Sequence, residues 1–301
     1  MKTALFYYSQ TSQALRVAQS ICSPLSEGEG NSVIIKQIEP TTDYPFPWNS
    51  YRFFDTFAET RLGVDVGKIK PLDFSDILDA DLVVIAGQSW FLSPSLPLQA
   101  FFSDKAVQEY LNGKQVIFIN ACRNMWLMTS RKIKSILKDI RAILVGQIIL
   151  QDKAFNLISA LTVVRWLLYG KKEKGWLLPA SGVREKEIKE AERFGVIIKE
   201  SFERKRVSDL QNELLSNGAI KYKPSLLHIE KTGYKMFGFW AKFIRKKGGM
   251  GDPERAGRVK LFKFYLIFVL FFLSPVVQIL FNISIPFRNI KEEKRKECSV
   301  N

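Results

Sequence analysis

The sequence predicts an α/β protein built on a doubly wound sheet of five parallel strands in the order 2-1-3-4-5. Two observations support this prediction. Up to about residue 202, short apolar runs alternate with amphipathic stretches, a pattern typical of a parallel sheet covered by helices on both faces. The first apolar run also passes directly into a polar loop and then a helix, as at a phosphate-binding first turn. The expected strands are Ala4–Tyr8, Val33–Ile38, Leu82–Ala86, Val116–Asn120 and Ala142–Leu150.

Helical spacing follows the strands. The stretch Met125–Lys138 is expected to be a helix, and Glu185–Phe202 carries apolar residues at intervals of three and four. We therefore expect residues 1–203 to form the core domain, residues 204–250 an amphipathic helical appendage, and residues 251–301 a basic linker, an apolar segment and a basic tail.

The loop after the first strand is rich in hydroxyl and amide groups. A phosphate at this point would meet the unpaired N–H groups of the first helical turn and the positive end of the helix dipole. An ordinary helix capped by Thr11 or Ser12 is the alternative. The residues expected to contact a phosphate are Ser9, Gln10, Thr11, Ser12 and Gln13.

Composition narrows the possible partners. The chain has 301 residues, of which 47% are hydrophobic, so a disordered chain is excluded. The formal charge of +15 favours anionic partners, and Lys and Arg are densest near the C-terminus, beside a long apolar run. That pairing favours a membrane surface with anionic lipids over nucleic acid. Three widely spaced cysteines indicate neither a disulfide framework nor a metal site.

Two aromatic-rich insertions interrupt the strand and helix pattern. Thr41–Asp79 contains the aromatic stretches Tyr44–Trp48 and Phe53–Phe57, and Ala154–Pro179 contains the apolar stretch Leu157–Leu168. Either insertion could be an extra core helix. If both flank the carboxyl ends of the strands, they wall an apolar pocket where such folds bind ligands.

The loops after the third and fourth strands have the chemistry that a flavin ring requires. Trp90 can supply a stacking face, and Arg123 can offset the negative charge that builds on the ring upon reduction. The alternative is that Trp90 and Trp126 are ordinary packing aromatics and Arg123 is a solvated cation. The expected ring contacts are Gln88, Ser89, Trp90, Phe91, Ala121, Cys122 and Arg123, with Asn124 as a further edge contact.

The stretches Tyr8–Gln13 and Gln88–Pro97 resemble the FMN-binding loops of flavodoxin-like oxidoreductases. Over roughly residues 1–245 the chain is similar to the bacterial flavodoxin-like family labelled "dialkylresorcinol condensing enzyme". The residues that carry this similarity are Tyr7–Thr11, Tyr44–Trp48, Phe53–Asp55, Trp90–Pro94, Arg123–Trp126 and Leu210–Leu215.

The resemblance implies FMN as cofactor and a hydrophobic ring substrate that carries long alkyl or aryl chains. Condensation itself fits poorly, because the only histidine, His228, lies in the appendage. The implied reaction is oxidation of a 2,5-dialkylcyclohexane-1,3-dione to the aromatic resorcinol, after an upstream ketosynthase. Arg123 or Asn124 is the candidate enolate holder, and Asp55, Glu59 or Tyr44 the candidate base. The alternatives are an NAD(P)H or quinone oxidoreductase and a non-catalytic membrane-bound binding protein.

The segment Phe264–Phe287 contains no charged residue over 24 positions. As a helix, with a rise of about 1.5 Å per residue, it is long enough to cross the hydrocarbon layer of a bilayer. Pro275 also permits a hairpin, and a buried core helix is the remaining alternative. The excess of cations before the segment favours a cytoplasmic N-terminal side, whereas the basic tail would resist export, so insertion without crossing is an open alternative to a span. In either case we expect the protein at the cytoplasmic face of the bacterial inner membrane.

Overall fold

The computed structural model describes residues 1–152, 156–176, 178–284 and 289–300. Its main sheet has five parallel strands in the order β2-β1-β3-β6-β7, which is 2-1-3-4-5 in chain order. The flavodoxin-like prediction is therefore confirmed by the strand order. The strands are β1 (Lys2–Tyr7), β2 (Ser32–Gln37), β3 (Leu82–Gly87), β6 (Gln115–Cys122) and β7 (Ile143–Gln151).

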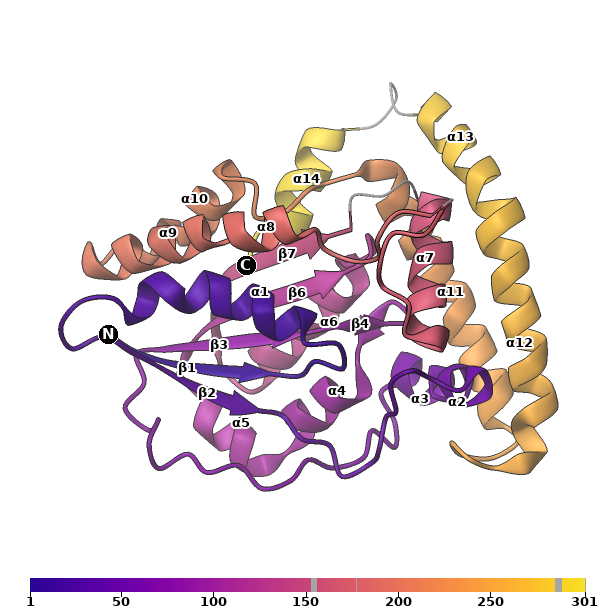
Figure 1. The fold of residues 1–301 in the computed structure, drawn as a ribbon, viewed down its shortest axis with the longest axis horizontal. Helices are drawn as coiled ribbons and strands as arrows, with labels where there is room; N and C mark the ends of the chain where they lie inside the picture. The colour runs from indigo at the N-terminus through magenta and orange to yellow at the C-terminus, as the bar shows by residue number, and fades with distance from the viewer. Residues whose placement is uncertain (153–155, 177, 285–288, 301) are drawn as a thin grey trace.

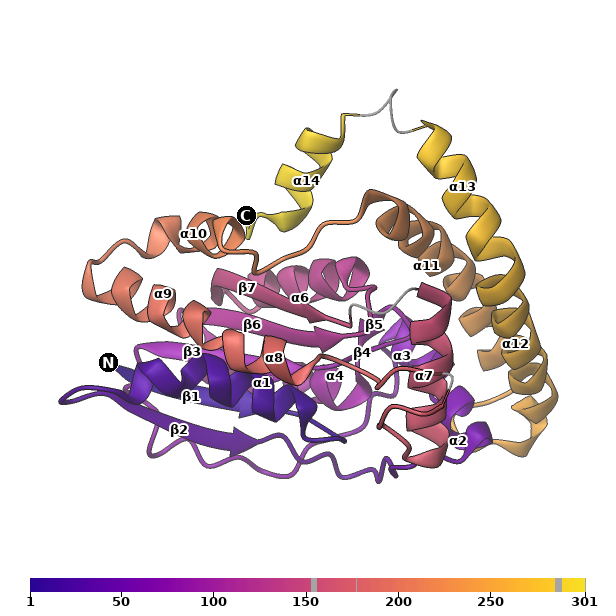
Figure 2. The ribbon, with the colours of Figure 1, turned by 45° about the horizontal axis from the view of Figure 1, so that its top comes forward.

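Helices cover both faces of the sheet (Figures 1 and 2). One face carries α1 (Gln13–Cys22), α8 (Glu185–Glu190), α9 (Glu192–Glu203) and α10 (Leu210–Ser216), with the short 3-10 turns η1 (Ser23–Ser26) and η2 (Val207–Asp209). The other face carries α4 (Leu96–Ser103), α5 (Lys105–Leu111) and α6 (Leu127–Asp139).

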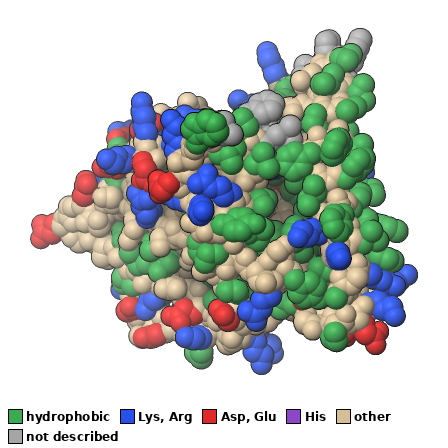
Figure 3. Space-filling model, turned by 45° about the vertical axis from the view of Figure 1, so that its right-hand side comes forward, with side chains coloured by type: hydrophobic (Ala, Val, Ile, Leu, Met, Phe, Trp, Pro, Cys, Tyr) green, Lys and Arg blue, Asp and Glu red, His purple; other side chains and the backbone are tan. Residues whose placement is uncertain are grey.

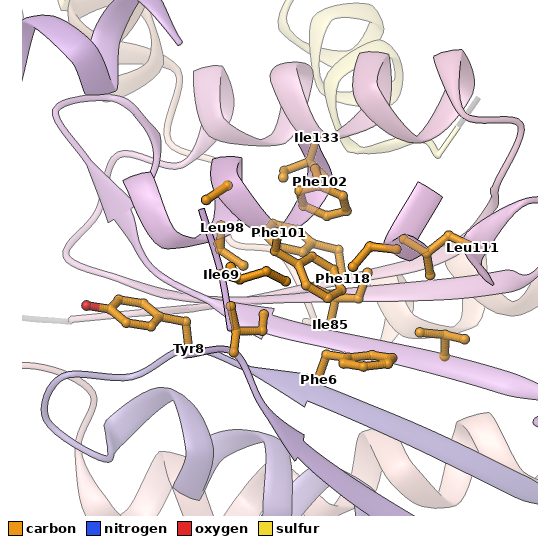
Figure 4. Packing of buried hydrophobic residues seen from close by; sticks show 14 of the residues in the cluster. Phe6, Tyr8, Ile69, Ile85, Leu98, Phe101, Phe102, Leu111, Phe118 and Ile133 are labelled. Atoms are coloured by element: carbon orange, nitrogen blue, oxygen red, sulfur yellow. The ribbon is translucent and has the colours of Figure 1, made fainter. Parts of the chain in front are cut away.

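Alternation along each strand divides the core into two halves. On β1, Phe6 faces the α4–α6 side and packs on Phe101 with ring centroids 5.2 Å apart, whereas Leu5 faces the α1 side (Figure 4). Both side chains are fully buried, and burying a large apolar side chain contributes about 1.5–3 kcal/mol.

A third helical layer stands at the carboxyl edge of the sheet, where the strand arrows end in Figure 1. Phe57 and Phe262 stack at its centre, with ring centroids 3.6 Å apart, and Phe237 packs against both rings. The layer comprises α2 (Ser50–Asp55), α3 (Phe57–Leu62), α7 (Asn156–Tyr169), α11 (Pro224–Arg245), η3 (Pro253–Arg255), α12 (Ala256–Phe268), the π-helical turn η4 (Val269–Leu273) and α13 (Ser274–Ser284).

A buried ionic cluster within this layer joins its C-terminal helices to α2 and α3, which belong to the insertion after β2. Arg255 is fully buried, and its Nε lies 2.6 Å from Asp55 Oδ1 while its Nη1 lies 2.7 Å from Glu59 Oε1. The backbone N–H of Gly251 donates to Asp55 Oδ2 at 2.7 Å, and Arg245 Nη1 reaches Glu59 Oε1 at 2.9 Å. Each buried carboxylate is thus neutralised by a cation from the C-terminal helices.

The expected linker and tail are structured. Residues 253–268 form η3 and α12, and α12 packs on α2. Helix α11 packs on α3, and residues of α11 and α12 lie in the same apolar cluster. The expected boundary at residue 250 therefore divides one packed layer. The expected basic tail contains α14 (Ile290–Cys298), which returns to the core domain. There Glu297 pairs with Arg131 and Lys231, because both cations face its buried carboxylate.

Within the described residues, one helix, Pro253–Ile283, is long and apolar enough to cross a membrane by length and composition alone. It is 31 residues long, an 18-residue window within it has a mean hydropathy of 2.4, and it continues through Pro275. The π-helical turn η4 lies directly before that proline, where the regular hydrogen-bond ladder must change. The hairpin alternative is therefore wrong up to Ile283. The last expected apolar residues, 285–287, lie outside the described part of the chain.

The ionic cluster makes stability sensitive to Arg255. Arg255→Met leaves two buried carboxylates without their main cation, so we expect the free energy of unfolding to fall by about 3–5 kcal/mol. Urea denaturation measures this change, with Lys260→Met, an exposed cation on the same helix, as the control. A loss below about 1 kcal/mol would show that the cluster contributes little to the fold.

Candidate active site

The loop between β1 and α1 presents unused donors. Ser12 adopts a left-handed backbone conformation with φ 57°, and no side chain caps α1 there, so Ser12 is not the ordinary cap considered above. The Oγ of Ser9 is buried and has no hydrogen-bond partner among the described residues. Free backbone N–H groups and an unpaired buried hydroxyl are what a bound phosphate needs.

The side chains of Gln10 and Gln13 form hydrogen bonds within the protein. Gln10 donates from Nε2 to the Tyr44 carbonyl at 3.1 Å and accepts from Trp48 Nε1 at 3.3 Å. The side-chain amide of Gln13 is paired with the backbone of Val183. Both side chains were expected to contact a phosphate. In this structure their amides hold neighbouring segments against the loop.

The loop after β3 forms a tight hairpin of β4 (Ser89–Trp90) and β5 (Ser93–Pro94), which the sequence did not predict. Its turn residues, Phe91 and Leu92, both have positive φ values of 47° and 63°. Such a conformation costs of order 1–3 kcal/mol per residue and persists only where the surroundings fix it. Phe91 is fixed by Phe53 and Phe57, with ring centroids 4.9 and 5.3 Å away.

Trp90 does not present an open stacking face. It is only 8% exposed and packs edge-to-face with Tyr8, Tyr44 and Trp48 at centroid distances of 5.4–6.1 Å. Its Nε1 donates to Gln88 Oε1 at 3.3 Å. The expectation that Trp90 offers a free face to a flavin therefore needs correction, because the first insertion supplies rings that cover it.

A cavity of about 470 Å³ opens beside the β1–α1 loop. Tyr44 and Phe46 contribute aromatic surface, and Ser9, Thr41 and Thr42 contribute hydroxyl groups. The first insertion thus forms one wall of a cavity, but no residue of the second insertion lines it, and much of its lining is polar rather than apolar. The volume lies within the range of about 300–1,000 Å³ that is typical of small-molecule sites.

The loop after β6 places a cation at the same edge of the sheet. The Nδ2 of Asn120, near the end of β6, donates to Ser89 Oγ at 2.9 Å, which joins this strand to the hairpin after β3. Burial lowers the pKa of Arg123 to about 10, while the nearby negative charge of Asp152 acts in the opposite direction. Arg123 therefore remains protonated at neutral pH. Asn124 beside it is buried.

The thiols at this edge and elsewhere are poor nucleophiles. Burial raises the pKa of Cys122 far above its usual value, and it raises the pKa of Cys22 to about 12 and of Cys298 to about 11. Thiolate chemistry at neutral pH is therefore not supported. Within the described residues, no group of three His, Cys, Asp or Glu side chains could hold a metal ion.

Asp55 is not free to act as a base, because both of its carboxylate oxygens are bound by Arg255 and the Gly251 backbone. Glu59, the second candidate base, is bound by Arg255 and Arg245. Tyr44 lies in the cavity wall, but burial raises its pKa to about 12. None of the three expected bases is thus well suited to accept a proton at neutral pH.

Sequence reasoning missed Glu230. It is fully buried on α11, and its carboxylate accepts from the backbone N–H groups of Trp126, Leu127 and Met128 at 3.1, 3.1 and 2.7 Å. It caps the N-terminus of α6 directly after the Arg123 loop. The available signal was a single acidic residue on the apolar stripe of α11, between Leu227 and Phe237.

Comparisons with known proteins give the following similarities. No protein-family model and no curated protein matches the chain. A flavodoxin from the domain Archaea is 12% identical with a TM-score of 0.38, covering 67% of this chain and 98% of its own. A flavoprotein in complex with FMN from Lactobacillus acidophilus NCFM is 18% identical with a TM-score of 0.40, covering 49% and 92%. An azoreductase from Bacillus anthracis str. Sterne is 13% identical with a TM-score of 0.35, covering 64% and 99%. The class assigned to this chain, flavodoxin-like α/β, rests on its own strand order.

Burial of Glu230 makes stability depend on pH. Desolvation raises the pKa of Glu230 from 4.5 to about 7, against the three N–H groups, which lower it. The folded state therefore binds the proton more tightly than the unfolded state, and stability falls as pH rises from about 4.5 to 7, by at most about 3 kcal/mol. Urea denaturation at pH 5 and pH 8 should show a smaller pH difference for Glu230→Gln than for wild type. Equal pH differences in both proteins would contradict this assignment.

Proposed function

We propose that this protein is an FMN-dependent oxidoreductase that acts on an apolar ring compound. The observation that carries the proposal is the convergence of three loops at the carboxyl edge of the sheet. The loop after β1 supplies anion donors, the insertion after β2 supplies aromatic surface beside it, and the loop after β6 supplies a half-buried cation. In doubly wound sheets, ligands bind at this edge.

The residues present fit FMN. Ser9 Oγ, Thr11 and the first-turn N–H groups of α1 would hold the phosphate, since Ser9 lacks another partner among the described residues and no side chain caps the helix. Tyr44 and Phe46 in the cavity wall would contact the ring. The cavity is lined by residues that follow β1 and β2, and the loop after β6 begins two strands from β1, about 10 Å away at the usual strand spacing.

Bound FMN supplies a hydride acceptor, a function that no protein side chain provides. For the finer assignment we propose a 2,5-dialkylcyclohexane-1,3-dione, which becomes a resorcinol when the ring loses one hydride and one proton and then tautomerises. A ketosynthase is the class of enzyme that would supply such a dione. The similarity to the dialkylresorcinol family supports this choice, as do the aromatic residues of the first insertion.

In this reaction the protein's own side chains would stabilise the negative charge of the enolate. The C–H group between the two carbonyls is already acidic, so the ring ionises without a buried base. Arg123 is the cation that would bind the enolate oxygen, with Asn124 as a neighbouring amide. A preorganised cation in a partly water-excluded site stabilises developing negative charge more strongly than it does in water.

The test is turnover of a dialkylcyclohexanedione by flavin-loaded protein under air, with the resorcinol detected by mass spectrometry. We expect resorcinol from wild type and a decrease in kcat of about 10²–10³-fold in Arg123→Gln, with Arg123→Lys less impaired because it keeps the charge. Unchanged flavin content in both variants is the control. Absence of resorcinol together with fast NADH-dependent quinone reduction would favour a quinone oxidoreductase instead.

A further inference from the structure

An exposed apolar stripe runs along the helix Pro253–Ile283. Its members are spaced by one, three or four residues, so they lie on one side of the helix, and each is 41–67% exposed. Figure 3 shows apolar side chains gathered on this side of the molecule. The stripe consists of Leu261, Phe264, Ile267, Phe268, Phe272, Leu273, Val276, Ile279, Leu280 and Ile283. Contiguous apolar surface of this kind marks a protein or membrane interaction site.

The opposite side of the same helix is attached to α11 along its length. Near its beginning, Tyr265 packs on Trp240 with ring centroids 4.8 Å apart. Near its end, Phe281 stacks on His228 at 4.8 Å, and Gln278 Nε2 donates to Ser225 Oγ at 3.4 Å. The helix therefore lies against the domain rather than projecting from it (Figure 2).

Both flanking segments are also held by the same domain. In the first turn of the helix, Arg255 is buried between Asp55 and Glu59. After it, α14 is held by the pair Glu297–Arg131. A helix that crossed a bilayer would have to carry one of these segments to the other side. That breaks either the buried Arg255 cluster, at a cost of several kcal/mol, or the pairing of the buried Glu297 carboxylate with the half-exposed Arg131.

The surface beside the helix has the features of a membrane interface. Helix α7 contacts the π-helical turn η4 and exposes Leu161 and Val164. The loop after α7 carries Trp176, which is 96% exposed, close to Lys171 and Lys174. Tryptophan and lysine side by side are enriched at the boundary between hydrocarbon and headgroups.

Exposed cations favour an anionic lipid surface over a second copy of this chain. They surround the turn between α11 and α12, and include Lys242, Lys246, Lys247 and Lys260. Near an anionic membrane each such cation contributes about 1 kcal/mol. Two copies meeting through the same face would instead bring these like charges together.

We infer that this protein docks on a bilayer from one side, with the helix Pro253–Ile283 lying in the plane of the interface. The apolar stripe enters the headgroup and acyl boundary, and the lysines contact anionic headgroups. This inference decides between the spanning and non-spanning alternatives that the sequence leaves open. It does not depend on the proposed flavin chemistry.

The first test is cosedimentation of full-length protein with vesicles of phosphatidylcholine, with and without phosphatidylglycerol. We expect binding that is stronger with phosphatidylglycerol and weaker at high salt. The double variant Phe268→Glu/Phe272→Glu should bind at least about tenfold more weakly, because it places charges at the apolar boundary. The matched control is Leu78→Glu/Val196→Glu, two exposed apolar positions away from this layer, which should bind as wild type does.

Circular dichroism and thermal unfolding of each variant establish that it is folded. Absence of vesicle binding by wild type would overturn the inference. The same holds if light scattering shows a dimer that the Phe268→Glu/Phe272→Glu variant dissociates, because a second copy would then cover the stripe.

The second test measures depth. Cysteines introduced singly at Phe264, Phe272 and Ile279 carry a fluorescent probe, and lipids with nitroxide groups at shallow or deep positions quench it. Labelled wild type provides the background, since Cys22 and Cys298 are buried. A helix in the interface places all three probes at the same shallow depth. A spanning helix places Phe272 deepest, and that result would overturn the inference.

Discussion

The full burial of Arg255 between Asp55 and Glu59 is the interaction on which the rest of this structure depends. It holds α12 against α2 and α3, and these two helices carry Phe53 and Phe57. Those rings in turn fix Phe91 in its left-handed turn conformation. The geometry of the hairpin after β3 is thus set by a residue from the C-terminal helices.

The carboxylate of Glu230 has a similar effect on the loop after β6, the strand next to β3. Glu230 on α11 binds the first N–H groups of α6 and so positions the end of the loop that carries Arg123. The loops after β3 and β6 are therefore both braced by the same helical layer. Buried ionic groups rarely add more stability than apolar replacements would, but they specify one arrangement. In this protein we assign them that role at the edge where the ligand is proposed to bind.

The alternation of apolar runs predicts the five strands, because a strand buried along its length, such as β3, is an apolar run in the sequence. The polar loop after the first strand predicts their order. The ion pair that occupies the Asp55 carboxylate could not be predicted in this way. Its partner Arg255 is 200 residues away in the chain, and a single sequence carries no sign of that pairing. The covering of Trp90 was missed for the same reason. The rings of Tyr44 and Trp48 that cover it come from the insertion after β2, far from Trp90 in the chain. The residues 251–263 look like a basic linker by composition, whereas Val259 and Phe262 are buried against α2 and α3.

The central claim is that the carboxyl edge of this sheet holds a flavin phosphate in the β1–α1 loop. The most direct measurement is the chromophore released on denaturing the purified protein, together with FMN titration of the apoprotein. The account predicts one FMN per chain, and it predicts that Ser9→Ala weakens FMN binding by about 1–3 kcal/mol, the effect of losing a hydrogen bond to a charged group. No flavin in the purified protein and no FMN binding by the apoprotein would contradict it.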